Sequence, residues 1–260
     1  MTGASWRVLV TRAREDFAAL ASILEARGAT AVALPCIEIR DPSDLFALDA
    51  VVARLRAGEA FDLVVLASPH AARRFVAALG VPPSSPVAAV GEATAQALRA
   101  LGVAVAAAPD DGGGAEALLA ALGGAMGGSL AGRRLLLPRA EEATPDLADG
   151  LRARGATVET VALYKTVAPE VADAEGMAAL RAGRIDAIAF ASGSAAKGFV
   201  KLLGAEAGPL AARCAIACIG QSTASVVRGL GLQVDAVGCG TLPSLVEALD
   251  RAGQAHRQPR

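Results

Sequence analysis

The feature that most constrains this chain is an internal repeat. The segment FDLVVLASPHAARRFVAALG at 61–80 matches IDAIAFASGSAAKGFVKLLG at 185–204 position for position. Each copy has an aspartate, an apolar run, an Ala-Ser step and then a helix-like stretch with Phe and Val on one side. Such self-similarity indicates that the same supersecondary unit is built twice.

Two further alignments extend the repeat. Residues 6–34 match residues 133–161 without a gap, and residues 87–105 match residues 216–234. The equivalent pairs include Arg12 with Arg139, Gly91 with Gly220, and Thr94 with Thr223.

Within each copy the pattern predicts a strand, a turn and a helix. Apolar runs with β-branched residues, as at 87–90 and 216–219, indicate strands. Phe17, Leu20 and Leu24 share one face of the first predicted helix. Alternating strands and helices are typical of an α/β fold with parallel sheets covered on both faces.

The length of 260 residues suits two domains. Extended stretches with prolines at 35–44 and 160–170 are candidate linkers. If the chain leaves one domain through the first and returns through the second, the linkers pair as two strands and the first domain is discontinuous. Two sequential halves are the alternative layout.

Composition narrows the choice of partner. The 25 basic and 26 acidic residues give a net charge of −1, which argues against nucleic-acid binding. Charge appears early at the N-terminus, and no uncharged run reaches the about 18 residues that a membrane span needs. We therefore expect a cytoplasmic protein without a signal peptide or membrane partner.

We expect no metal site, because the cysteines lack Cys-x-x-Cys spacing and the chain has only two histidines, His70 and His256. The cysteines are predicted to be small buried residues. The glycine-rich stretch at 110–132 predicts a helix over 112–122 followed by a flexible connector, and residues 251–260 are predicted to be a frayed tail.

No strong catalytic motif is present, but small or hydroxyl residues recur where predicted strands give way to helices. In parallel sheets these turns gather at the carboxyl edge, where ligands usually bind. Helix N-termini attract anions there. We expect the turns of two facing domains to line a cleft for an anionic ligand. Ordinary N-capping is the alternative for any one turn.

Three kinds of side chain are further candidates. Arg12 and Arg139 follow equivalent strands and could clamp carboxylates, or could lie on the surface. Tyr164 is the chain's single tyrosine and could present its hydroxyl to a ligand, or could only pack. His70 is a weaker candidate for a base, because its counterpart is Ser194.

The ordered motifs resemble those of the uroporphyrinogen-III synthase family. From about Val8 to Leu249 they are VLVTRARE, LASPHAARRF, VAAVGEATAQALRALG, LLLPRAE, RGATVETVALYKT, IAFASGSAAKGF and IACIGQSTASVVRGLG. The resemblance implies two flavodoxin-like domains joined by a two-stranded linker. The implied boundaries are 1–36 plus 168–255 for domain 1, 44–160 for domain 2, and 37–43 and 161–167 for the linkers.

The resemblance also implies an activity. A monomer without cofactor or metal would cyclise hydroxymethylbilane, a linear tetrapyrrole, with loss of water and inversion of ring D. Helix N-termini and hydroxyls could hold this polycarboxylate without a positive net charge. A two-domain metabolite-binding or regulatory protein on the same scaffold is the alternative.

Residue by residue, Tyr164 corresponds to the family tyrosine proposed to hydrogen-bond the departing hydroxyl. Ser68 and Ser192 correspond to the serines of the family's Thr-Ser steps, and Ser222 and Thr223 to the hydroxyl pair of its glycine turn. Together with the candidates from the repeated turns, the expected substrate-binding residues are Arg12, Ser68, Gly91, Thr94, Arg139, Ser192, Gly220, Ser222 and Thr223. The chain departs from the family pattern at Ala67 and Ala191, where threonine is common, and at Gly193, where proline is frequent.

Overall fold

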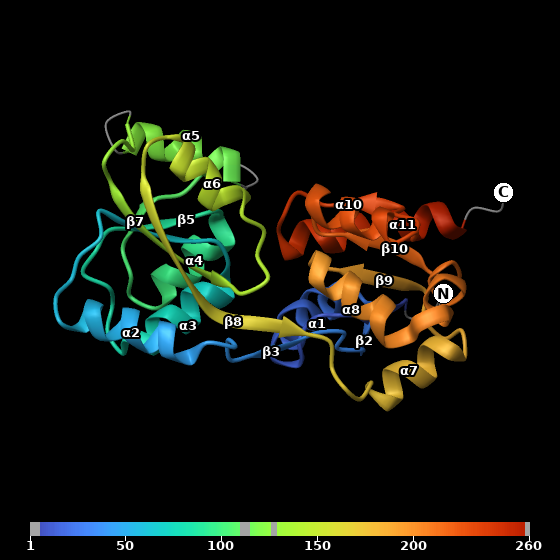
Figure 1. Cartoon of the computed structure of the whole chain (residues 1–260). Helices are drawn as coiled ribbons and strands as arrows, with labels where there is room; N and C mark the ends of the chain where they lie inside the picture. Colours follow the sequence, from blue (N-terminus) through green and yellow to red (C-terminus); the bar gives the residue numbers. More distant parts are fainter. Residues whose placement is uncertain (1–5, 110–114, 126–128, 258–260) are drawn as a thin grey trace. The chain divides into compact units, whose positions relative to one another are not determined.

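The computed structural model describes residues 6–109, 115–125 and 129–257. The chain divides into two compact units (Figure 1). Unit 1 comprises Met1–Ile39 and Val167–Arg260, and unit 2 comprises Arg40–Thr166. Unit 1 is therefore assembled from two segments far apart in the sequence.

Unit 1 contains a five-stranded sheet in the order β2-β1-β9-β10-β11. The strands are β1 (Arg7–Val10), β2 (Thr30–Ala33), β9 (Ala187–Phe190), β10 (Ala215–Cys218) and β11 (Ala236–Val237). Neighbouring strands pair in parallel. Counted along the chain the order is 2-1-3-4-5, which is the flavodoxin-like arrangement.

Helices cover both faces of this sheet. They are α1 (Phe17–Ala26), α7 (Ala174–Arg181), α8 (Gly193–Leu203), α9 (Ala207–Ala211), α10 (Gln221–Gly229) and α11 (Leu242–Arg257). Leu9 and Ile188 belong to the core that includes α8 and α10, whereas their neighbours Val8 and Ala187 belong to the core that includes α1 and α11. Successive strand residues point to opposite faces, so each strand supplies both cores.

Unit 2 contains most of a six-stranded sheet in the order β3-β8-β7-β4-β5-β6, while Glu38 and Ile39 of β3 and Val167 of β8 fall in unit 1. Its strands are β3 (Glu38–Arg40), β4 (Leu63–Leu66), β5 (Val87–Ala89), β6 (Val105–Ala107), β7 (Arg134–Ala140) and β8 (Thr157–Val167). Its helices are α2 (Leu45–Arg56), α3 (Pro69–Leu79), α4 (Glu92–Ala100), α5 (Ala115–Ala125) and α6 (Asp146–Ala153). If β3 is left out and β7, β8, β4, β5 and β6 are numbered one to five, the strand order is again 2-1-3-4-5. Unit 2 is therefore a circular permutation of unit 1. The predicted α/β fold with parallel sheets is confirmed.

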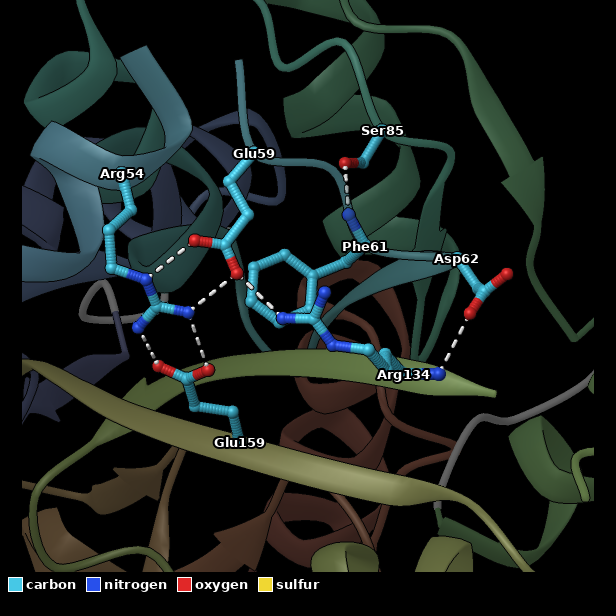
Figure 2. A network of polar contacts seen from close by, with 7 residues as sticks. All are labelled: Arg54, Glu59, Phe61, Asp62, Ser85, Arg134 and Glu159. Carbon is cyan, nitrogen blue, oxygen red and sulfur yellow. Dashed lines mark hydrogen bonds and ion pairs between the residues drawn. The ribbon is translucent and has the colours of Figure 1, made fainter. Parts of the chain in front are cut away.

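An ion network ties α2 to the amino end of this sheet (Figure 2). Arg54 donates to Glu59 at 2.7 and 2.8 Å and to Glu159 at 2.7 and 3.0 Å. Arg134 also donates to Glu59, at 2.6 Å. Hydrogen bonds from Arg54 and then Arg134 lower the pKa of Glu59 from 4.5 to about 2. The network lies where β7 begins, at the opposite edge from the strand ends that bear the candidate residues.

Both units use an aspartate to join strand starts. Asp62 accepts the backbone N–H of Arg134 at 2.8 Å, and Asp186 accepts the backbone N–H of Arg7 at 2.7 Å. The aspartates are equivalent in the repeat, and each also donates its own N–H to the carbonyl of the same arginine at 2.9 Å. The repeated aspartate is therefore structural.

Some sequence predictions need correction. The predicted linkers are not among these: 37–43 contains β3 and 161–167 lies in β8, and these are neighbouring strands of one sheet, while β8 also pairs with β7 as far as Tyr164. The predicted tail is helical through Arg257, because α11 continues and buries Ala252. Residues 110–114, which include the start of the predicted helix, and 126–128, in the predicted connector, lie outside the described residues. No helix among those described has the length and apolar character to cross a membrane.

Candidate functional site

Tyr164 lies at the carboxyl end of the paired part of β8. Its Cα partner in β7 is Ala140, the last residue of that strand. The side chain is 7% exposed, and its Oη lies 3.1 Å from Ser68 Oγ. The ring also packs against His70, with centroids 5.9 Å apart and planes tilted by 53°. The carboxyl edge of this sheet thus holds a nearly buried phenol that is fixed on two sides.

Ser68 is the N-cap of α3. Its backbone is extended, and its Oγ accepts the N–H of Ala71 at 3.0 Å. Pro69 occupies the first helical position, where a missing N–H costs nothing. Ser68 therefore caps its helix, which was the alternative to ligand binding at this turn, and the same oxygen also contacts Tyr164.

The loop after β7 holds the backbone around Tyr164. Glu141 donates its N–H to the carbonyl of Tyr164 at 2.8 Å. The Glu142 carboxylate accepts the N–H of Thr166 at 3.0 and 3.1 Å. Arg74 donates to the carbonyl of Leu163 at 3.4 Å. The strand is therefore held on both sides of the tyrosine.

Glu141 also binds the segment that enters unit 2. Its carboxylate accepts the N–H of Ser43 at 2.7 Å and the hydroxyl of Ser43 at 2.9 Å. These hydrogen bonds, the backbone one first, lower the pKa of Glu141 below its ordinary value. Lys165 Nζ lies 3.2 Å from Ser43 Oγ. The side chains of Ser43 and Lys165 thus connect the predicted linker segments within unit 2.

The two equivalent arginines bind groups close to them in sequence. Arg12 forms an ion pair with Asp16 at 3.0 Å, and its Nε is buried without a hydrogen-bond partner in the described part of the chain. Arg139 donates to the carbonyl of Thr144 at 3.1 Å and to that of Ala143. Ala143 is the repeat equivalent of Asp16. A ligand carboxylate would have to compete with these contacts.

The matching serine turn of unit 1 is also capped. Ser192 Oγ accepts the N–H of Ala195 at 3.1 Å, with the same extended backbone as Ser68. Ser192 is half-buried. The repeat therefore preserves the cap, while Tyr164 is the chain's single tyrosine and belongs to unit 2.

The glycine turns differ, because glycine has no side chain with which to cap. Gly91 and Gly220 are the extended N-caps of α4 and α10. No side chain caps either helix, and in α4 the Thr94 N–H donates to the Gly91 carbonyl at 3.0 Å, so the amides that precede Thr94 are the ones without a side-chain cap. Thr94 and Thr223 are only 3% and 7% exposed, so their hydroxyls face the protein interior, whereas Ser222 is exposed.

Among the described residues, no group of three or more His, Cys, Asp or Glu side chains is placed to hold an ion. Cys36, Cys214 and Cys218 are buried and Cys239 is exposed. Burial raises the pKa of Cys214 to about 11 and that of Cys218 to about 12. These two thiols are therefore poor nucleophiles near neutral pH.

Comparison with known proteins decides the family. The family model described as uroporphyrinogen-III synthase HemD matches residues 18–239. A curated uroporphyrinogen-III synthase from Synechococcus elongatus is 30% identical over 234 residues, which cover 86% of each chain. This chain belongs to the uroporphyrinogen-III synthase family. The resemblance drawn from its motifs is confirmed, and the family's members are enzymes of tetrapyrrole biosynthesis.

Solved uroporphyrinogen-III synthases share the fold. A mutant enzyme from the extremely thermophilic bacterium Thermus thermophilus aligns with a TM-score of 0.61 and 22% identity, covering 96% of this chain and all of the other. The enzyme from Helicobacter pylori aligns with a TM-score of 0.57 and 16% identity, over 97% of this chain and all of the other. These likenesses support the α/β architecture of this uroporphyrinogen-III synthase family member.

Sequence reasoning missed the acidic pair Glu141 and Glu142. The sequence did contain a signal for this pair, because two carboxylates follow a predicted strand directly. In the other copy of the repeat the aligned residues are Arg14 and Glu15, of which only one is acidic. Their partners lie on segments distant in sequence, so the contacts themselves were not visible in the motif.

Proposed function

We propose that this chain closes hydroxymethylbilane to uroporphyrinogen III, with loss of water and inversion of ring D. The observation that carries the proposal is the Tyr164 hydroxyl, held by Ser68 at 3.1 Å at the carboxyl edge of the unit 2 sheet. Family membership supplies the reaction, and this edge supplies the group suited to its first step.

In that step the C–O bond of the substrate's hydroxymethyl group breaks. The electron-rich pyrrole pushes the hydroxyl out, and negative charge develops on the departing oxygen. A preorganised donor aimed at that oxygen stabilises the transition state. Tyr164 donates its proton to this oxygen, so that the group leaves as water, and the phenol recovers a proton from the substrate when ring closure releases one.

Ring closure then depends on orientation. The cation left behind must be attacked by the substituted carbon of the terminal ring, through a spiro intermediate that rearranges. The reaction joins two ends of one molecule, and holding these ends in reacting geometry favours attack by this carbon over other conformations of the chain. Few titrating side chains are needed, which agrees with the lack of a strong catalytic motif in the sequence.

The substrate's carboxylates need binding groups. In unit 2 the first-turn amides that follow Gly91 serve this purpose, and in unit 1 those that follow Gly220 do so together with the exposed hydroxyl of Ser222. Ser192, Arg12 and Arg139 are further binding groups in this proposal. Thr94 and Thr223 act through the packing of their helices, because their side chains are buried.

The test is the isomer composition of the product. The chain is incubated with freshly prepared hydroxymethylbilane, and the products are oxidised and separated by chromatography. Uncatalysed closure gives the type I isomer, so we expect type III to increase with enzyme concentration and to vanish with heat-denatured protein. Type I alone at every concentration would overturn the proposal and favour the metabolite-binding or regulatory alternative.

The proposal includes a monomeric, cytoplasmic enzyme, as expected from the sequence. Light scattering during size-exclusion chromatography checks this, with the expected mass being the 25.9 kDa of the single chain. A stable dimer mass at assay concentrations would contradict the monomer.

A further inference from the structure

The Ser68 hydroxyl stands between a helix N-terminus and the proposed catalytic phenol. Its oxygen accepts the Ala71 N–H at 3.0 Å and lies 3.1 Å from Tyr164 Oη. A serine hydroxyl has one proton to donate and room for two accepted hydrogen bonds. The contact can therefore run from serine to tyrosine or the reverse, and the two directions have opposite consequences for catalysis.

We propose that Ser68 is a positioning residue whose hydroxyl donates a hydrogen bond to Tyr164 Oη during the reaction. The inference rests on the proposed function, in which Tyr164 donates to the departing hydroxyl. With its oxygen occupied by Ser68, the tyrosine directs its own proton to the substrate. In the reverse direction the tyrosine proton would be held by Ser68 and withheld from the leaving group.

The α3 N-terminus favours the first direction. The Ala71 N–H belongs to the positive end of the helix and withdraws electron density from Ser68 Oγ. A polarised hydroxyl is a better donor, and hydrogen bonds in a chain strengthen one another. Donation to Tyr164 Oη in turn stabilises the charge that the phenol oxygen gains as it donates to the substrate.

Burial keeps this chain of contacts intact. Tyr164 is 7% exposed and Ser68 is half-buried, so water competes weakly for the contact. The tilted ring of His70, 5.9 Å from that of Tyr164, limits rotation of the phenol. The position of Tyr164 Oη is thus set by packing, and its hydrogen-bond direction is set by Ser68.

The repeat offers a matched control. Ser192 caps α8 through the Ala195 N–H at 3.1 Å, as Ser68 caps α3 through that of Ala71. Ser68→Ala and Ser192→Ala should therefore lower the melting temperature similarly, since each removes one cap. Only the first removes a contact with Tyr164.

The experiment is a double-mutant cycle on type III formation. We expect Ser68→Ala to lower kcat about tenfold, as for one hydrogen bond used in the transition state, with KM within about twofold of wild type. Ser68→Thr, which keeps the hydroxyl, should restore kcat. In a Tyr164→Phe background, Ser68→Ala should lower kcat no further, whereas Ser192→Ala should act independently of Tyr164→Phe.

The outcomes separate the two ideas. A reduced kcat in Tyr164→Phe with an unchanged or raised kcat in Ser68→Ala overturns the inference alone. Multiplicative losses in the double variant also overturn it. An unchanged kcat in Tyr164→Phe overturns the role of the tyrosine and the inference with it. If Ser68→Ala does not fold, Ser68→Gly removes the hydroxyl and is better tolerated than alanine at an N-cap.

Discussion

The carbonyl oxygen of Cys36 lies directly against the backbone of Gly198 in α8, so that a Cβ at this glycine would overlap it. The equivalent residue in unit 2 is Arg74, which reaches past its helix to the carbonyl of Leu163. In unit 1 the segment after β2 can cross α8 because residue 198 has no side chain.

Gly198→Ala should therefore destabilise the fold by about 1–3 kcal/mol, the usual range for overpacking a core. Gly229→Ala is the control, since a Cβ there has nothing within 4 Å and the residue is also helical. Urea unfolding of both variants checks the difference. Equal urea midpoints for the two variants would show that the segment after β2 can move away from α8 without loss of stability.

Glu142→Ala should lower kcat several-fold with little change in unfolding midpoint. The exposed carboxylate holds the N–H of Thr166, two residues from Tyr164, and its loss loosens the strand end that carries the phenol. Glu142→Gln keeps an acceptor and should retain most activity. The measurement is the steady-state kcat of Glu142→Ala and Glu142→Gln. Equal activity of the two variants would rule out a positioning role for Glu142.

Arg12→Ala should raise KM with little change in kcat, if its guanidinium exchanges Asp16 for a substrate carboxylate on binding. The measurement is KM for hydroxymethylbilane. A wild-type KM together with a lowered melting temperature would make Arg12 a structural partner of Asp16.

The fold should lose stability in acid through Glu59. Its pKa falls from 4.5 to about 2 on folding, so its contribution is present above pH 4.5 and is lost as the pH drops towards 2. Glu59→Gln should make the urea midpoint fall less steeply between these values. Glu247→Gln, on the exposed side of α11, controls for the loss of one charge. If the urea midpoints of wild type and Glu59→Gln fell equally steeply with pH, Glu59 would not be the source of the acid sensitivity.

The architecture was accessible from the sequence because local patterns determine it. Aligning 6–34 with 133–161 and 61–80 with 185–204 identifies equivalent strands and helices, and the sheet orders follow the same equivalence. The ion pair of Arg12 with Asp16 joins residues only four positions apart, so it was also open to sequence reasoning.

The site was harder to predict because its contacts join distant segments. Ser68 and Tyr164 lie 96 positions apart, and neither motif shows that β8 brings them together. The hydroxyls of Thr94 and Thr223 looked available in the sequence, yet each falls on the inner face of its helix and is buried. Residue type identified plausible substrate-binding side chains, but only the packing of the helices shows which of their hydroxyls are exposed and which are buried.

The most direct test of the account is kcat for type III formation by Tyr164→Phe, measured beside its melting temperature. The substitution removes one oxygen and keeps the ring that packs against His70. We predict a fall in kcat of about tenfold or more, since a donor to the departing oxygen is lost, with KM and melting temperature close to wild type. A wild-type kcat in a folded Tyr164→Phe protein would contradict the account.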